Sequence, residues 1–242
     1  MERCKRENDR TVASIFINPT QFNNAADLEK YPRTTEKDIL KLLRGGNDVL
    51  YLPEADDIYH KGVESSKVDL GNLDKSMEGS SRPGHFEGVV QVVELLLRIV
   101  EPHKLYLGQK DYQQYIIVRE MIRQLDLKVE TVLCPTHREA DGFAMSSRNV
   151  RLSEQQRAQA PVIIETLNYI KENAFQLDLT KIKAFADQKL SSNPEVSEVE
   201  YIDVVDSQTL TPLDKLTKGT EAIVCIAVRM GEVRLMDNTI IS

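Results

Sequence analysis

The stretch LYLGQKDYQQYIIVREMI, from Leu105 to Ile122, begins like a buried strand and ends like an amphipathic helix. Polar residues fill the junction, which in an open parallel sheet is where ligands bind. Gly108 would let a ligand approach the backbone, and Lys110 with the N–H groups of the helix start can hold phosphate oxygens. Asp111 can accept hydrogen bonds from sugar hydroxyls, and Gln114 can donate and accept. The set fits a nucleotide beside a hydroxylated small molecule, although a helix start with ordinary polar residues has the same spacing.

Strand-like and helical runs alternate on both sides of this stretch. The predicted strands are TVASIFI (11–17), DVLYLP (48–53), KLYLG (104–108) and KVETVLC (128–134). The predicted helices are TEKDILKLLRGG (35–46), FEGVVQVVELLLRIV (86–100) and YQQYIIVREMIRQL (112–125). This alternation predicts an α/β fold with a Rossmann-like, mostly parallel sheet that helices cover on both faces.

The pattern changes after about residue 136. Ser153, followed by Glu154 and Gln156, predicts the start of a long helix, and a second helix is expected at 180–192. Three strand-like runs close the chain: VEYIDVVD (199–206), TEAIVCIAVR (220–229) and EVRLMDNTII (232–241). They predict a smaller C-terminal α+β domain with a three-stranded antiparallel sheet. We therefore expect two domains, residues 1–136 and 137–242.

The composition is typical of a soluble globular protein, with 41% hydrophobic and 29% charged residues in a chain of 242. A net charge of −7 argues against a nucleic-acid partner bound by a general positive field. Cys4, Cys134 and Cys225 lie far apart without CxxC spacing, which suits reduced cysteines. The charged N-terminus MERCKRENDR is unlike a signal peptide, and the apolar run at 89–100 is too short to span a bilayer. We expect a cytoplasmic protein with no membrane or nucleic-acid partner.

Two further polar clusters follow predicted strands. NPTQF (18–22) comes after the first strand, where Gln21 alone would be an ordinary turn residue. PTHREADGFAMSSRN (135–149) follows the strand that ends at Cys134 and contains Ser146, Ser147 and Arg148. Two hydroxyls and a guanidinium can follow the charge that builds on a leaving pyrophosphate. A surface loop with a helix cap is the alternative for this segment.

Taken together, these clusters resemble the pantothenate synthetase (pantoate–β-alanine ligase) family, which belongs to the nucleotidyltransferase superfamily. The motifs that carry the resemblance are NPTQF, DLEKYPRT (27–34), RPGHFEGV (82–89), GQKDYQQ (108–114) and READGFAMSSRN (138–149), in this order. The resemblance implies a two-step ligation in which the pantoate carboxylate attacks the α-phosphate of ATP, assisted by Mg²⁺, to give pantoyl adenylate and pyrophosphate. The amine of β-alanine then displaces AMP to form pantothenate. The family is usually dimeric, so a homodimer is expected.

The resemblance also implies roles for individual residues. The implied ATP-binding residues are Gly108, Gln109, Lys110, Asp111, His137, Met145, Ser146, Ser147 and Arg148. Of these, Lys110, Ser146, Ser147 and Arg148 form the implied catalytic set around the phosphates. Gln21 and Gln114 would bind pantoate, and Asp38 falls in an acidic region associated with magnesium. We expect the remaining prominent histidine, His85, to hold a loop or cap the helix at 86–100.

The N-terminus departs from the family pattern. The family begins with a strand and a P-T-M-G-x-L-H-x-G-H loop, whereas this chain opens with MERCKRENDRTVASIFI and contains no HxGH or HxxH. We interpret the opening as the end of a helix that runs into the second family strand. We therefore expect a chain that lacks the first strand and histidine pair, through a start site assigned too late, and that has little ligase activity alone.

Two other interpretations stay open at this point. One is a nucleotidyltransferase that acts on another acceptor, although the two glutamines and the YPRT segment favour pantoate. The other is a non-catalytic nucleotide-binding or dimerising protein.

Overall fold

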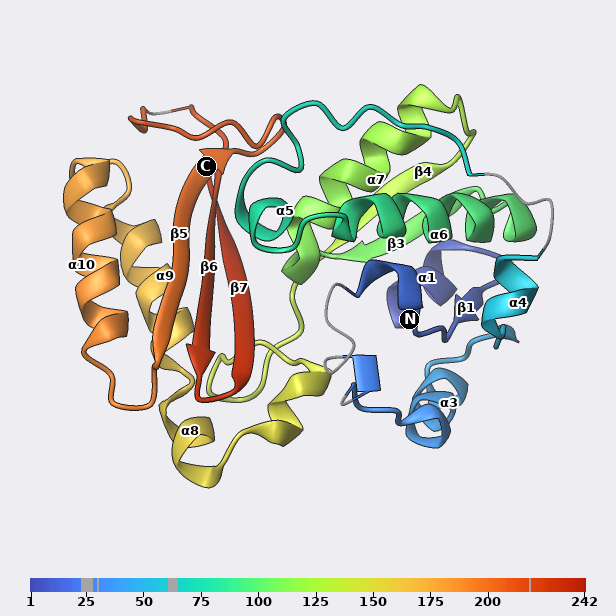
Figure 1. The fold of residues 1–242 in the computed structure, drawn as a ribbon, viewed down its shortest axis with the longest axis horizontal. Coiled ribbons are helices and arrows are strands. Elements are labelled where there is room, and N and C mark those ends of the chain that lie inside the picture. Colours follow the sequence, from blue (N-terminus) through green and yellow to red (C-terminus); the bar gives the residue numbers. More distant parts are fainter. Residues whose placement is uncertain (23–27, 30, 61–64, 218) are drawn as a thin grey trace. The chain divides into compact units, whose positions relative to one another are not determined.

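The structure is a computed structural model that describes residues 1–242 apart from 23–27, 30, 61–64 and 218 (Figure 1). Two compact units can be distinguished. The first comprises Met1–Leu70, Arg82–Tyr106 and Ile117–Val132. The second comprises Gly71–Ser81, Leu107–Ile116 and Leu133–Ser242. The predicted boundary at residue 136 lies near the last change of unit, and 71–81 and 107–116 belong with the C-terminal part.

The first unit is built around a short parallel strand pair and one long helix. Its elements are α1 (Glu2–Glu7), β1 (Val12–Ser14), η1 (Pro19–Gln21), α3 (Thr35–Arg44), β2 (Val49–Tyr51), α4 (Ala55–Ile58) and α6 (His85–Val100). β1 and β2 pair in parallel with Val12 opposite Val49. β1 is shorter than the predicted strand at 11–17, because its partner β2 ends at Tyr51, two residues before Pro53. Val92 and Leu95 of α6 pack on Ile58, and these contacts form the core described for this unit.

The strand–helix–strand stretch that begins the sequence argument forms as predicted. β3 (Lys104–Gly108), the 3₁₀ turn η2 (Gln109–Asp111), α7 (Tyr112–Gln124) and β4 (Glu130–Cys134) follow in order. β3 pairs with β4 in a two-stranded sheet apart from the β1–β2 pair, so the first four described strands form two small sheets of the predicted α/β fold. β1 and β2 have only three residues each, which leaves few ladder hydrogen bonds to extend a sheet.

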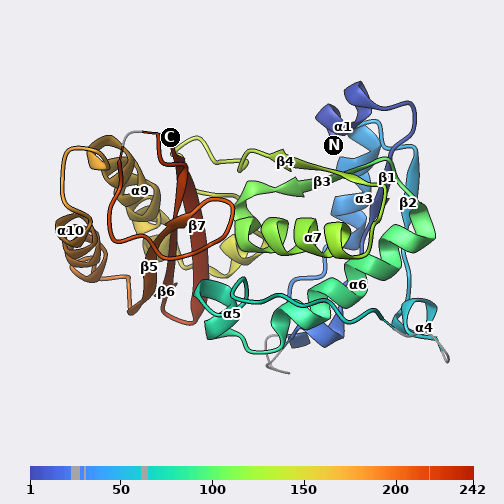
Figure 2. The ribbon, with the colours of Figure 1, turned by 90° about the horizontal axis from the view of Figure 1, so that it is seen from above.

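The second unit contains the predicted antiparallel sheet, in the order β5 (Glu198–Asp206), β6 (Ala222–Met230) and β7 (Val233–Ile241). Helices α9 (Val162–Asn173) and α10 (Leu179–Ser191) cover one face of it (Figures 1 and 2). Alternate residues of β6 face opposite ways: Val224 and Ile226 pack in the helix-covered core, and Ile223 and Cys225 pack with Tyr112. The central strand is therefore buried on both faces, and burial raises the pKa of the Cys225 thiol above its usual range.

The predicted long helix from Ser153 was wrong in its length. Ser153 does cap a helix through a capping box with Gln156, but this helix, α8, covers only Glu154–Gln159. A new helix, α9, begins at Val162, directly after Pro161. Proline has no N–H for the helical ladder, so it ends one helix and suits the first turn of the next.

The described helices were also compared with the length and apolarity that a membrane span requires. No helix in the described part of the chain is both long enough and apolar enough to cross a membrane.

Candidate active site

The turn after β3 leaves open space beside its glycine. Gly108 has φ −77° and ψ 134°, an extended conformation that any residue can adopt. A Cβ atom added at Gly108 would meet no other atom within 4 Å. The backbone conformation therefore does not require glycine at this position, and a ligand can approach the chain closely here.

Asn238 of β7 holds the backbone of the same turn. Its Nδ2 donates to the carbonyl oxygens of Gln109 at 2.8 Å and Lys110 at 2.9 Å. Its Oδ1 accepts a hydrogen bond from Nε2 of Gln109 at 3.2 Å. The Lys110 ammonium lies 3.8 Å from Asp111 and makes no hydrogen bond within the part of the chain that the structure describes. The turn is thus fixed through its main chain, and the Lys110 ammonium remains available to an anion.

The segment READGFAMSSRN folds into a small hairpin followed by the 3₁₀ helix η3 (Ser147–Arg151). Arg138 and Ala144 form a bridge, and Gly142, with φ +86°, makes the turn between them. That left-handed conformation favours glycine. Met145 N–H donates to the carbonyl of His137 at 2.9 Å, and both side chains are exposed. The hairpin leads directly to Ser146. The Ser146 hydroxyl accepts a hydrogen bond from the Arg148 N–H at 3.3 Å and caps η3.

One pocket of the second unit contains predicted residues from both segments. Its lining residues are Lys110, Phe143, Ala144, Ser146, Arg148, Asn149, Arg234, Leu235 and Met236. Among the predicted ATP residues, those outside the lining are Gly108, Gln109, Asp111, His137, Met145 and Ser147. The structure thus brings Lys110 together with Ser146 and Arg148 around one pocket.

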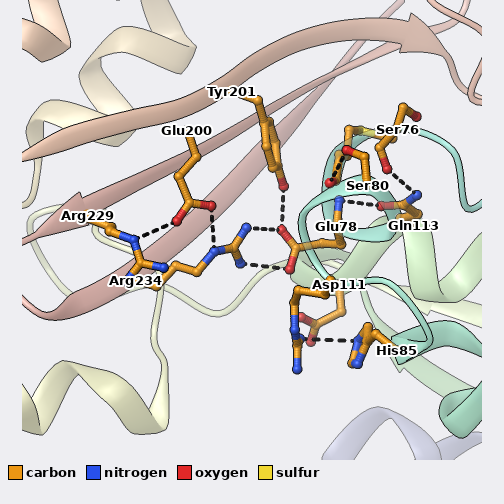
Figure 3. A network of polar contacts seen from close by, with 12 residues as sticks. Ser76, Glu78, Ser80, His85, Asp111, Gln113, Glu200, Tyr201, Arg229 and Arg234 are labelled. Carbon is orange, nitrogen blue, oxygen red and sulfur yellow. Dashed lines mark hydrogen bonds and ion pairs between the residues drawn. The ribbon is translucent and has the colours of Figure 1, made fainter. Parts of the chain in front are cut away.

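Arg234, which also lines this pocket, is already neutralised by two carboxylates (Figure 3). Its Nη atoms donate to Glu78 at 2.6 and 2.7 Å, and its Nε donates to Glu200 at 2.7 Å. Tyr201 donates its hydroxyl hydrogen to Glu78 at 2.7 Å. A β-bulge between Val199 and Tyr201 lets Glu200 and Tyr201 both reach this network.

The pKa values of two members follow from their surroundings. Burial by itself would lower the pKa of Arg234, but the contacts with Glu78 and Glu200 raise it above its usual range. Burial raises the pKa of Tyr201, and the neighbouring Glu78 carboxylate adds to the effect. Arg234 is therefore a charged but fully engaged wall of the pocket, and Tyr201 is a neutral donor.

Sequence reasoning missed this network and Asn238. A signal was present in β7, where Arg234, Asp237 and Asn238 stand among apolar residues. Their partners, however, lie from 34 to 156 positions away in sequence, and the spacing does not identify them.

The two glutamines after Tyr112 differ sharply. Gln113 is buried, and its side chain accepts from the Glu78 N–H at 2.9 Å and donates to the carbonyls of Leu73 and Ser76. Gln114 is half-buried in the first turn of α7, and no hydrogen bond of its side chain occurs among the described residues. Gln113 therefore supports the α5 segment (Met77–Ser81), and Gln114 is the member of the pair that is available to a ligand.

Gln21 belongs to the first unit, where its loop is held tightly. Nδ1 of His85 lies 2.8 Å from the Gln21 carbonyl, so the ring must carry its proton there, because a carbonyl only accepts. Arg82 donates to the same carbonyl at 3.3 Å, and Oε1 of Gln21 accepts from Asn18 at 3.4 Å. Gly88 lies so close that an added Cβ would be 2.6 Å from the Thr20 oxygen. The interpretation that His85 holds a loop is confirmed.

Asp38, the predicted magnesium ligand, lies in the first turn of α3. Its carboxylate accepts from the Thr34 hydroxyl at 2.9 Å and lies 3.6 Å from the Lys41 ammonium. Among the described residues no group of three or more His, Cys, Asp or Glu side chains could hold a metal ion. Mg²⁺ is usually bound by one or two carboxylates together with substrate phosphates, so Asp38 as a magnesium ligand stays a prediction, with its carboxylate already in contact with Thr34 and Lys41.

Comparison with known proteins gives a consistent result. The family model for pantoate–β-alanine ligase matches residues 1–240. The pantothenate synthetase of Porphyromonas gingivalis is 42% identical over 238 residues, which are 98% of this chain and 84% of the relative. That of Thermotoga neapolitana is 42% identical over 244 residues, 100% of this chain and 85% of the relative.

Solved structures show the same similarity. The crystal structure of pantothenate synthetase from Thermus thermophilus superposes with a TM-score of 0.91 at 40% identity, covering 98% of this chain and 86% of the other. The pantoate–β-alanine ligase of Francisella tularensis, crystallised with "Beta-gamma ATP" and β-alanine, has a TM-score of 0.73 at 33% identity, with coverages of 98% and 82%. On this evidence the chain belongs to the pantoate–β-alanine ligase family.

Proposed function

We propose that the pocket of Lys110, Ser146 and Arg148 holds the phosphates of ATP while this enzyme ligates (R)-pantoate to β-alanine. The supporting observation is that these three residues, from two separate loops, line one pocket of the second unit. Arg234 lines it too, but its guanidinium is engaged by Glu78 and Glu200. Phosphate binding would therefore depend mainly on Lys110 and on the η3 segment that carries Arg148.

The chemistry consists of two substitutions by substrate groups. A carboxylate oxygen of pantoate attacks the α-phosphorus of ATP, the bond from this phosphorus to the bridging oxygen breaks, and pyrophosphate leaves. The amine of β-alanine then attacks the acyl carbon, AMP leaves with the bonding electron pair, and the nitrogen loses a proton. No protein nucleophile is needed, so the protein contributes positioning and neutralisation of charge. Lys110 and Arg148 would offset the charge that accumulates on the leaving pyrophosphate.

The other assigned roles extend this proposal. Gln114, whose side chain is available in the first turn of α7, and Gln21 would bind pantoate. Asp111, more than half exposed, would accept from the ribose hydroxyls. The open space at Gly108 would admit the nucleotide close to the chain. Backbone groups of Gln109, His137 and Met145, with the Ser147 hydroxyl, would complete the ATP contacts.

Some expectations remain predictions beside this proposal. They are the need for Mg²⁺, which when bound would neutralise phosphate charge, the homodimer and the cytoplasmic location.

The two steps can be tested separately. Exchange of labelled pyrophosphate into ATP reports the first step and should require pantoate but no β-alanine, whereas net AMP release should require all three substrates. Lys110→Ala should lower the exchange rate by about 100-fold, as for the loss of one donor to a developing charge. Lys104→Ala is the matched control, because Lys104 lies at the other end of β3 and pairs with Glu130.

The same assays distinguish the alternatives. Exchange that occurs with a different acid, but not with pantoate, would assign the enzyme another acceptor. Binding of ATP without pyrophosphate exchange under any condition would indicate a non-catalytic nucleotide-binding protein. Equal exchange rates for Lys110→Ala and wild type would remove the proposed phosphate site.

A further inference from the structure

Strand β7 contacts both loops of the proposed phosphate site, η2 with Lys110 and η3 with Arg148. Two adjacent polar residues of this strand, Asp237 and Asn238, are 4% and 2% exposed. Buried polar side chains are costly unless they are fully hydrogen-bonded. The partners of these two residues therefore indicate what they are for.

Asn238 acts on the Lys110 turn. Its amide nitrogen uses its two hydrogens on the Gln109 and Lys110 carbonyls, and its amide oxygen accepts from the Gln109 side chain. Gly108, directly before these residues, is surrounded by open space, so Asn238 supplies the contacts that fix the turn.

Asp237 acts on the other loop. Its carboxylate accepts from Nη1 of Arg138 at 2.6 Å and Nη2 at 3.1 Å, and also from the Asn238 N–H at 2.8 Å. Arg138 in turn donates to the Gly142 carbonyl at 3.0 Å and is bridged to Ala144. Asp237 thereby anchors the hairpin that leads into Ser146.

The contacts that hold the sheet do not depend on these two side chains. The β6–β7 ladder runs without interruption through them, with Ile226 opposite Asp237 and Cys225 opposite Asn238. Successive strand residues point to opposite faces, so neighbouring positions can reach two different loops. Both side chains therefore contact loop segments, and β7 pairs with β6 through its main chain, with the Asn238 N–H donating in addition to the Asp237 carboxylate.

We propose that Asp237 and Asn238 are positioning residues that together set the separation between Lys110 and the Ser146–Arg148 segment. Asn238 fixes the Lys110 turn, and Asp237 fixes the hairpin before Ser146. Because Asp237 and Asn238 are consecutive residues of one strand, both loops are attached to the same rigid element. The inference rests on the proposed role of Lys110, Ser146 and Arg148 in phosphate binding.

The test compares Asn238→Ala and Asp237→Asn with a control on the same strand, Thr239→Val, in the 242-residue chain. Hydrogen–deuterium exchange should accelerate about 30-fold in residues 107–113 for Asn238→Ala, as expected for two lost hydrogen bonds. For Asp237→Asn the acceleration should fall in residues 137–146 instead. Exchange in β6 should stay unchanged in both. ATP affinity, measured by calorimetry, should weaken by about 30-fold in each, within the range for a displacement near 1 Å, and should not change in Thr239→Val.

A double variant shows whether Asn238 acts through Lys110. Combined with Lys110→Ala, Asn238→Ala should weaken ATP binding little further, because the group that it positions is gone. Fully additive losses, or acceleration spread evenly over the second unit, would overturn the inference. If ATP affinity were normal in Asn238→Ala but weakened in Lys110→Ala, the positioning role would be overturned and the proposed function would stand. Normal affinity in Lys110→Ala would overturn the proposed function and with it the positioning role. If Asn238→Ala does not fold, Asn238→Ser, which is uncharged and keeps at most one of the two donors, takes its place.

Discussion

The Gln21 loop of the first unit and the Lys110 turn of the second unit are both fixed by hydrogen bonds, but they differ in how closely other atoms pack around them. In both, donors from elsewhere in the unit bind main-chain carbonyls: His85 and Arg82 at Gln21, and Asn238 at Lys110. The Gln21 loop is also pressed against Gly88, where an added Cβ would lie 2.6 Å from the Thr20 oxygen. Beside Gly108, at the Lys110 turn, no atom lies within 4 Å of such a Cβ.

This difference shows two ways to place a ligand-binding side chain. The first relies on close packing, which tolerates no added atom. The second relies on buried polar and charged contacts and leaves room beside the chain. The close packing requires glycine at position 88, and we propose that glycine at position 108 leaves room for the ligand, so substitutions should separate the two requirements.

The largest effect on the free energy of unfolding is expected when the buried Arg234 network of the second unit is disrupted. Arg234→Met would remove the guanidinium that donates twice to Glu78 and would leave Glu200 with Arg229. The two carboxylates are only 6% and 12% exposed, so this loss should lower the free energy of unfolding by about 3–5 kcal/mol. Urea unfolding followed by circular dichroism measures this, since the chain has no tryptophan. The control is Arg229→Met, whose side chain is 41% exposed and also contacts Glu200, with an expected loss below about 1 kcal/mol. Equal losses in the two variants would contradict a special role for burial.

Breaking the packed region comes next. Gly88→Ala would force a methyl group against the backbone of Thr20 and Gln21 and should cost about 1–3 kcal/mol of unfolding free energy. The hydrogen bond between Asn18 and the Gly88 carbonyl, 3.1 Å long, should be lost with it. A thermal midpoint equal to that of wild type would show that the loop can move aside and that the region is not packed as described.

The sequence predicted local features better than distant ones. β3 and α7 were predicted closely because their periodicity lies within a few neighbouring residues. The long helix from Ser153 was wrong because the effect of Pro161 outweighs an otherwise helical pattern. The predicted α/β fold with a C-terminal antiparallel sheet is confirmed, but the division of the first four strands into two small sheets could not be predicted, since strand pairing depends on contacts that periodicity does not encode.

The candidate site divides in the same way. The family motifs pointed to Lys110, Ser146 and Arg148, which line one pocket. They gave no hint of Asn238, whose partners are 128 and 129 positions away. Nor could spacing assign Gln113 to the support of α5 and leave Gln114 for a ligand, because that distinction depends on what packs against each side of α7.

The open region predicts a smaller and different effect. Gly108→Ala fits the backbone conformation and should change the free energy of unfolding by no more than about 1 kcal/mol, in the stabilising direction. ATP affinity should nevertheless weaken by about tenfold, because the methyl group would occupy space needed by the nucleotide. Calorimetric titration with ATP, beside urea unfolding of the same sample, measures both. A loss of stability like that of Gly88→Ala, or unchanged ATP affinity, would remove the distinction between the two glycines.

The smallest effect concerns a partly exposed ion pair of the first unit, a counterpart to the buried Arg234 network. Asp48 accepts from Lys5 at 2.7 Å and from the N–H and hydroxyl of Thr11 at 2.8 Å, and these contacts lower its pKa from 3.8 to about 2. Since the folded-state pKa is the lower one, the stabilisation is present above pH 3.8 and is lost as the pH falls through 2. Asp48→Asn should therefore lower the urea midpoint at pH 7, and its difference from wild type should shrink between pH 4 and pH 2. Lys5→Met, which removes the largest cause of the shift, should reduce the same pH dependence. If the difference in urea midpoint between Asp48→Asn and wild type stayed constant down to pH 2, protonation of Asp48 would not be coupled to folding.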